Sequence, residues 1–244
     1  MKAAPADQLR LLDLADLDAR LRQTEHARRN PPQAARVKEL LESRPALSHE
    51  LAQRQSAVDD LRGEQDRIEA DVKVVQARRD RDAALLQTVS NPKDAAGLEH
   101  ELASLARRQR ELEDAELEVM EQLETAETAV AAQEALLADT NAEGVRLSAE
   151  AKQLVADATA RVEELARDRA AVTASVPADL VAQYERNTAR GGVGAALLRA
   201  RTCTGCHMML SGTDLGVLRQ AEADDVALCP ECGCILVRTG ESGL

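Results

Sequence analysis

Residues 90–97 read Ser-Asn-Pro-Lys-Asp-Ala-Ala-Gly (SNPKDAAG), between two long segments that both have the pattern of a helix. Proline lacks a backbone N–H and biases the residue before it away from helix, so Asn91-Pro92 predicts that a helix stops here. Ser90 or Asn91 is suited to cap the next helix, with Pro92 in its first turn. The sequence therefore predicts a turn near residues 88–95.

The two arms that flank this turn have equal length, because residues 7–90 and residues 92–175 each comprise 84 positions. Apolar residues recur in both arms at alternating steps of four and three, the pattern of a coiled coil. In the first arm nine of 13 seam positions are apolar: Leu47, Leu51, Arg54, Val58, Leu61, Gln65, Ile68, Val72, Val75, Arg79, Asp82, Leu86 and Val89. In the second arm fifteen of 22 are apolar: Leu98, Leu102, Leu105, Gln109, Leu112, Glu116, Val119, Leu123, Ala126, Val130, Gln133, Leu137, Thr140, Gly144, Leu147, Ala151, Leu154, Ala158, Arg161, Leu165, Asp168 and Val172.

Equal arms with one seam each predict an antiparallel coiled-coil hairpin over residues 1–176, since each arm then covers the apolar stripe of the other. The alternative is a parallel dimer, which needs the helix to run through Asn91-Pro92. The first arm is interrupted at Asn30-Pro31-Pro32 and is expected to kink at Pro45. We interpret this as a kinked helix whose stripe shifts register, with a hinge between a base and a tip segment as the alternative.

The composition agrees with a mainly α-helical, elongated protein. The chain has no Phe, no Trp and one Tyr, while 30% of its residues are charged. The N-terminal sequence lacks the apolar region of a signal peptide, and no segment holds the roughly 20 apolar residues of a membrane span. We therefore expect a cytoplasmic protein without a membrane partner.

Charge is unevenly distributed along the predicted hairpin, although the total is −12. From Glu111 to Glu143 there are eleven acidic residues and neither Lys nor Arg. Basic residues gather nearer the turn, where two segments are expected to face each other. We call these basic residues the basic collar, which comprises Arg78, Arg79, Arg81, Lys93, Arg107, Arg108 and Arg110. They are either ordinary flanking charges paired with Asp and Glu, or a surface that contacts an acidic partner or phosphates.

All five cysteines lie in the last fifth of the chain, in two CxxC pairs separated by 22 residues: Cys203 with Cys206, and Cys229 with Cys232. Each CxxC turn places two sulfurs on one side of a tight loop, and two such turns supply the four thiolates that Zn²⁺ prefers. Paired CxxC thiols in a chain without an export signal favour metal binding in a reducing compartment. The sequence therefore predicts one structural zinc ion.

The remaining residues near these pairs have subordinate roles in this interpretation. Cys234 is the spare thiol and is expected to pack as a small apolar side chain, while His207 is an alternative ligand to a set that is complete without it. A redox disulfide is a weaker alternative, because the usual βαβ context is missing. Residues 195–244 would form a zinc ribbon, with ALLRART (196–202) as a strand into Cys203 and ILVRT (235–239) as a strand after the second pair. Residues 177–194 would form a short helix and a Gly-rich joint.

The chain resembles the bacterial C4-type zinc-ribbon proteins with an N-terminal coiled-coil hairpin. The resemblance covers the whole chain, and its specific part is Tyr184, Gly191-Gly192, CTGC at 203–206 and CPECGCIL at 229–236. It implies no catalytic activity, and it implies association with transcription factors or RNA as known for some members. A basic residue would be expected in place of Cys234. This departure leaves the zinc ligands intact but removes a positive charge from a surface that could contact nucleic acid.

These observations predict a non-enzymatic interaction or scaffold protein whose rod and ribbon dock macromolecular partners. We expect a protein partner first, and the resemblance implies a connection to transcription. One alternative is RNA or DNA binding through the ribbon. The composition argues against it, because the segment from Gly191 onward contains four arginines and six carboxylates and has no aromatic residue for base stacking. Another is an RNA polymerase regulator acting through the tip, where Asp94 is the one acidic residue. No phosphate-binding loop, nucleophile motif or clustered histidines indicate an enzyme or a small-molecule substrate.

Overall fold

The computed structural model describes residues 1–244, most of them helical. The elements in chain order are α1 (Pro5–Arg29), α2 (Ala34–Leu86), α3 (Pro92–Ala174), α4 (Ala178–Thr188), β1 (Ala195–Arg199), β2 (Thr202–Cys203), α5 (Gly212–Gln220), β3 (Ala227–Leu228) and β4 (Ile235–Val237). They form two compact units. Unit 1 comprises Met1–Ala34 and Ala149–Leu244, and unit 2 comprises Ala35–Ser148.

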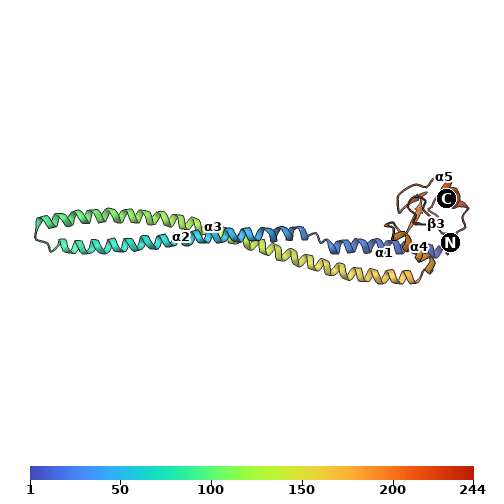
Figure 1. Cartoon of the computed structure of the whole chain (residues 1–244), viewed down its shortest axis with the longest axis horizontal. Coiled ribbons are helices and arrows are strands. Elements are labelled where there is room, and N and C mark those ends of the chain that lie inside the picture. The colour runs from blue at the N-terminus through green and yellow to red at the C-terminus, as the bar shows by residue number, and fades with distance from the viewer. The chain divides into compact units, whose positions relative to one another are not determined.

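Unit 2 is a helical hairpin whose turn lies where the sequence predicts it. Helix α2 ends at Leu86 and α3 begins at Pro92, and the two helices lie side by side in Figure 1. The side chain of Asn91 accepts a hydrogen bond from the Lys93 N–H at 3.0 Å and donates one to Asp94 at 2.9 Å. Asn91 therefore caps α3, and the hairpin rather than an uninterrupted helix is confirmed.

The seam of unit 2 is built from the predicted positions. Val58, Leu105, Leu112 and Val119 are buried along it. Polar seam residues bind the opposite helix: Gln133 donates to the Leu47 carbonyl at 3.0 Å, Arg54 donates to the Ala129 carbonyl at 3.0 Å, and Arg79 donates to Gln109. Residue numbers rise on α2 while they fall on α3, as an antiparallel pair requires. These partly buried polar contacts help to fix the register of the hairpin.

The first arm is divided into two helices. The interruption predicted at Asn30-Pro31-Pro32 is present, because α1 ends at Arg29 and α2 begins at Ala34. Helix α2 continues through Pro45 without a break, and the kink expected there stays a prediction. The carbonyl that loses its partner there belongs to Leu41, which is 61% exposed, so water can satisfy it.

The part of α3 that belongs to unit 1 departs from the predicted seam. Leu165 is buried as expected, but Leu154 and Asp168 are exposed. Arg169 is turned inward instead, because it binds Asp18 of α1 and Glu185 of α4. The predicted register is therefore wrong at these two positions. Beside Asp168, the side chain of Arg169 contacts both α1 and α4, whereas a heptad seam serves one partner helix.

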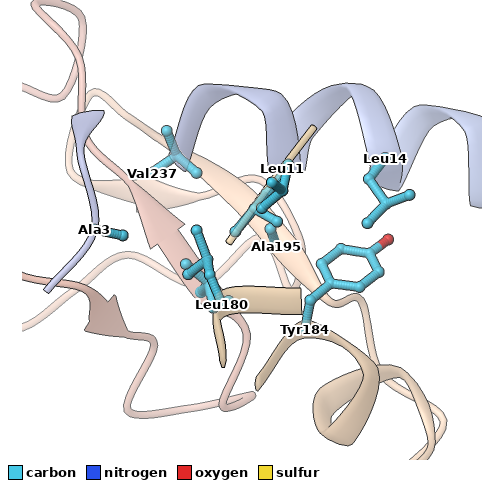
Figure 2. Packing of buried hydrophobic residues seen from close by; sticks show 9 residues of the cluster. Ala3, Leu11, Leu14, Leu180, Tyr184, Ala195 and Val237 are labelled. Carbon is cyan, nitrogen blue, oxygen red and sulfur yellow. The ribbon is translucent and has the colours of Figure 1, made fainter. Parts of the chain in front are cut away.

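One hydrophobic core joins α1, α4 and the ribbon within unit 1 (Figure 2). Its buried members are Ala3, Leu11, Leu14, Val176, Leu180, Tyr184, Ala195, Ile235 and Val237. Burial of one large aliphatic side chain contributes about 1.5–3 kcal/mol, so a cluster of this size holds the ribbon firmly against the two helices. The first three residues add backbone hydrogen bonds, from the Ala3 N–H to the Asp224 carbonyl and from the Val226 N–H to the Met1 carbonyl.

A polar network lies at the edge of this core. The hydroxyl of Tyr184 donates to Asp18 at 2.7 Å, and Asp18 also accepts from Arg169 at 2.5 Å. Arg169 completes the network with a 2.6 Å hydrogen bond to Glu185. Burial, followed by the hydrogen bond to Asp18, raises the pKa of Tyr184. The network links α1, α3 and α4 through groups that would be costly to leave unpaired.

The ribbon contains a four-stranded sheet in the order β2-β1-β4-β3. Strand β1 is parallel to β4, with Ala195 opposite Ile235, and antiparallel to β2. The prediction of a single strand from residue 196 into Cys203 is wrong. The chain reverses at Ala200-Arg201, where φ is 44° and 64°, which are the positive values of a two-residue hairpin turn.

Helix α5 occupies the connector between the two cysteine pairs. Ser211 caps its start by accepting from the Asp214 N–H at 3.2 Å. Its C-terminal end is held by the guanidinium of Arg238, which donates to four carbonyls at 2.5–3.1 Å, those of Leu218, Ala221, Glu222 and Asp225. The guanidinium thus satisfies carbonyls that have no partner within the helix. None of the helices in the structure combines the length and apolar composition that crossing a bilayer requires.

Candidate metal centre

The two CxxC segments fold into loops of the same design. In the first, the His207 N–H donates to the Cys203 carbonyl at 2.8 Å and the Cys203 N–H to the Met208 carbonyl at 3.0 Å. The second loop repeats both hydrogen bonds. The Gly233 N–H donates to the Cys229 carbonyl at 2.9 Å, and the Cys229 N–H donates to the Cys234 carbonyl at 2.8 Å. Each loop therefore presents its two sulfurs on one side, as the spacing predicts.

The residue after each loop needs a left-handed backbone. Gly233 has a φ of 74° and His207 has a φ of 59°. Glycine adopts this conformation without strain, whereas histidine does so less readily. His207 is exposed and is not among the residues whose ligand atoms cluster at the metal centre. His207 therefore lies at a backbone turn, and the cluster of four sulfurs forms without it as an alternative ligand.

The four predicted ligands come together at one point. The sulfur atoms of Cys203, Cys206, Cys229 and Cys232 lie within 4.8 Å of one another. Sulfurs at about 2.3 Å from one tetrahedral zinc are about 3.8 Å apart, and the sulfurs of Cys206 and Cys229 are separated by 3.8 Å. The donor set and its dimensions fit one structural Zn²⁺ ion. Four thiolates leave no open position for water, so this site has the closed coordination of a structural metal.

Burial differs among the four ligands. Cys203 and Cys229 are buried, Cys206 is intermediate and Cys232 is exposed. Burial raises the pKa of Cys229 to about 12, so this thiol depends on the metal to remain a thiolate. Burial acts against the thiolate of Cys232 too, but hydrogen bonds from the Cys234 backbone and neighbouring thiols outweigh it and lower its pKa to about 7.

The fifth cysteine lies beside the metal ligands. Cys234 is fully buried in a second core, which contains Leu198, Leu236 and α5 residues, and it packs there as a small apolar side chain. Its sulfur is also 3.4 Å from that of Cys232 and 3.6 Å from that of Cys203. The description as a spare apolar residue is thus incomplete, because the thiol touches two zinc ligands.

The structure also locates the basic collar, within unit 2. The hydrogen bond from Arg79 to Gln109 brings the segments 78–81 and 107–110 together. Arg78 pairs with Glu101 at 2.6 Å and Arg108 pairs with Glu111 at 3.7 Å. No ion pair reaches Arg81, Lys93, Arg107 or Arg110, although Arg110 donates to the Ala106 carbonyl. The collar therefore contains both paired and unpaired cations, and its role as a contact surface stays a prediction.

The chain matches two family models. Residues 14–192 match the CT398-like coiled coil hairpin domain, and residues 202–236 match the C4-type zinc ribbon domain. An uncharacterised protein of Mycobacterium tuberculosis is 36% identical over 243 residues, which is 98% of each chain. An uncharacterised protein of Mycobacterium leprae is 24% identical over 227 residues, covering 91% of this chain and 96% of the relative.

Two solved structures are similar over almost the whole chain. A Mycobacterium smegmatis protein is 31% identical with a TM-score of 0.74, and the match covers 98% of this chain and 100% of the other. CT398 from Chlamydia trachomatis is 15% identical with a TM-score of 0.55, over 95% of this chain and 97% of the other. The second likeness shows a shared fold alone. The curated relatives are uncharacterised, and neither matching family model describes an enzyme.

Proposed function

The chain belongs to the family of CT398-like coiled-coil hairpin proteins, and we propose that it is a non-enzymatic scaffold whose hairpin binds a protein partner. The metal centre supports the non-enzymatic part of this proposal, because four thiolates close the coordination of the zinc. The proposal for the partner depends on the surface of unit 2, where one stretch of α3 is acidic and exposes apolar side chains.

That stretch is defined by Leu117, Met120, Glu121 and Glu124, and we call it the acidic face. Leu117 is 60% exposed and Met120 is 47% exposed. Both line a shallow hollow of about 350 Å³ together with the two glutamates and Gln65 of α2. Exposed apolar groups beside a hollow mark interaction sites more often than scattered ones do.

The charge of the acidic face indicates which kind of partner fits it. Ion pairs neutralise Glu127, bound to Arg62 at 2.7 Å, and Glu143, bound to Arg36 at 3.0 Å. No ion pair reaches Glu121 or Glu124, and α3 has neither Lys nor Arg between Glu111 and Glu143. A cationic, amphipathic protein segment would match both the uncompensated carboxylates and the apolar groups.

A photo-crosslinking residue placed at Met120 in the full chain tests this function in the native cell. The same residue at Val145, which is 72% exposed, serves as the control position. We expect Met120 to yield crosslinked peptides with net positive charge, and we expect the pair Glu121→Lys and Glu124→Lys to remove them. Glu163→Lys with Asp168→Lys, at two exposed positions elsewhere on α3, is the control with the same change in charge. Equal yields at Met120 and Val145, or crosslinks that survive charge reversal, would refute the acidic face as the docking surface.

A second candidate function is nucleic-acid binding, and the structure favours the basic collar over the ribbon for it. Two of the four arginines in the ribbon are engaged, because Arg238 binds carbonyls and Arg199 pairs with Glu241 at 3.1 Å. The facing segments 78–81 and 107–110 instead hold six arginines and one aspartate. Phosphate contacts depend on such local positive charge.

A retardation assay with RNA and DNA at physiological salt tests this candidate. We expect Arg81→Glu with Arg107→Glu to weaken any shift, and Arg199→Glu to leave it unchanged. The absence of a shift at micromolar protein for both nucleic acids would eliminate it. The tip has an acidic residue for a polymerase-directed role in Asp94, but its carboxylate is bound by Asn91, which gives it a function in helix capping.

A further inference from the structure

We propose that Cys232 and Cys234 form an intramolecular disulfide when hydrogen peroxide reaches the metal centre, and that this modification releases the zinc ion. The inference concerns the metal centre alone and is independent of the proposed docking functions. It depends on the position of Cys234, a thiol that the four-ligand site does not need.

Cys234 is placed to react with a ligand sulfur without a change of fold. Its sulfur lies 3.4 Å from the sulfur of Cys232, and a disulfide brings two sulfurs to about 2.05 Å, so a movement of little more than 1 Å suffices. The residue between them is Gly233, at a φ of 74°. Glycine gives this short segment the conformational freedom that a small disulfide ring demands.

Burial determines which ligand the oxidant attacks. Cys232 is the most exposed of the four ligands, because Cys206 is intermediate and Cys203 and Cys229 are buried. Peroxide in solution therefore meets the Cys232 sulfur first. Cys234 is fully buried and is shielded from direct oxidation, yet it touches the sulfur that is attacked. One residue is thus exposed to the oxidant and the other is positioned as the resolving thiol.

The chemistry balances in two steps. The Cys232 thiolate attacks one oxygen of hydrogen peroxide, the O–O bond breaks, and a sulfenic acid and hydroxide form. The Cys234 sulfur then attacks the Cys232 sulfur, an S–S bond replaces the S–OH bond, and the hydroxyl leaves with the thiol proton as water. Two electrons pass from the two sulfurs to the peroxide, which ends as one water and one hydroxide.

The modification removes one ligand from the zinc ion. The sulfenic acid of Cys232 can still bind the zinc ion as its anion, whereas a disulfide sulfur carries no negative charge. The disulfide step would therefore leave the ion with the thiolates of Cys203, Cys206 and Cys229. Structural zinc contributes to folding through its complete ligand set, and loss of one thiolate lowers its affinity steeply. We therefore expect disulfide formation and zinc release to occur together, and a dithiol reductant with added zinc to reverse both.

The alternative sulfur pairs define what the experiment must distinguish. Cys203 and Cys234 are 3.6 Å apart, but both are buried away from the oxidant. Cys206 and Cys229 are 3.8 Å apart, and a disulfide between them would not need Cys234. Tandem mass spectrometry of the peptide Gln220–Arg238, which contains Cys229, Cys232 and Cys234, locates the bond.

The test treats the zinc-loaded full chain with hydrogen peroxide, follows zinc release with a chromogenic chelator, and maps disulfides at matched times. We expect a Cys232–Cys234 bond that appears at the rate of zinc release, and a several-fold slower release from Cys234→Ser. Cys234→Ala is the second variant and separates loss of the thiol from the effect of a new hydroxyl in the core.

Three results would overturn the proposal. The first is an equal rate of zinc release from the wild-type chain and from a Cys234 variant that binds zinc. The second is a disulfide that maps to another pair of cysteines while Cys234 stays free. The third is zinc release that precedes the formation of any disulfide. If neither variant binds zinc, disulfide mapping on the wild-type chain still tests the proposal, because that measurement needs no substitution.

Discussion

The close approach between Gly194 and Tyr184 makes Gly194→Ala a sensitive test of the packing in unit 1. A Cβ at residue 194 would lie 2.4–2.6 Å from three ring atoms of Tyr184. The ring cannot move aside easily, because it is 1% exposed and its hydroxyl is bound to Asp18 at 2.7 Å. Overpacking of this kind costs about 1–3 kcal/mol, so we expect that loss of stability around β1 and α4.

Amide hydrogen exchange measured by mass spectrometry is the appropriate assay, because the two units can open separately and a single unfolding midpoint would mix them. At fixed free zinc, a loss of about 1–3 kcal/mol accelerates exchange by about 5- to 150-fold. We expect this acceleration in peptides covering 178–199, with little change in peptides of unit 2.

Gly144→Ala provides a matched control of opposite sign. No atom lies within 4 Å of an ideal Cβ at Gly144, which is inside α3. Replacing a helical glycine with alanine stabilises by about 0.5–1 kcal/mol, so exchange near residue 144 should slow. A Tyr184→Leu background should reduce the cost of Gly194→Ala. Unchanged exchange in Gly194→Ala, or an equal cost in both backgrounds, would show that the ring does not pack against this residue.

Two further predictions concern the tyrosine and the metal. The chain has one Tyr, so its ultraviolet titration reports Tyr184 alone, and we expect a midpoint above the ordinary value of 10.0 because burial and the hydrogen bond to Asp18 raise the pKa. The folded state then binds the hydroxyl proton of Tyr184 more tightly than the unfolded state does. The contribution of Tyr184 to stability is therefore complete below pH 10 and is lost as the pH rises above 10. A titration midpoint at or below 10 would contradict the burial of this side chain. Cys229→Ser should abolish stoichiometric zinc binding, and it should loosen α1 and α4 as well as the ribbon, because Ile235 and Val237 share a core with Leu11 and Leu14. The hairpin of unit 2 should stay helical by circular dichroism, and retained zinc in this variant would contradict the ligand assignment.

The sequence was sufficient for the features that depend on local chemistry. Asn91-Pro92 predicted the turn because proline ends a helix wherever the chain places it. The two CxxC pairs predicted the metal ligands because spacing alone brings two thiols to one side of a loop. The seam of unit 2 was predictable for the same reason, since a heptad pattern requires only one partner helix.

Features that join distant residues were not predictable. A buried tyrosine hydroxyl needs a partner, but nothing in the sequence identifies Asp18, 166 positions away, as that partner. Arg238 has the appearance of an ordinary surface arginine, and its role at the end of α5 appears only in the fold. The turn at Ala200-Arg201 was missed because such turns usually carry Asn-Gly, and neither residue is present here.

The account depends most on one zinc ion held by four cysteine sulfurs. X-ray absorption spectroscopy at the zinc edge, on the reduced full chain with zinc quantified per molecule, measures this directly. We predict one zinc per chain and a shell of four sulfurs at about 2.3 Å, from Cys203, Cys206, Cys229 and Cys232. A shell that contains nitrogen or oxygen, or a reduced preparation that retains well under one zinc per chain, would contradict it.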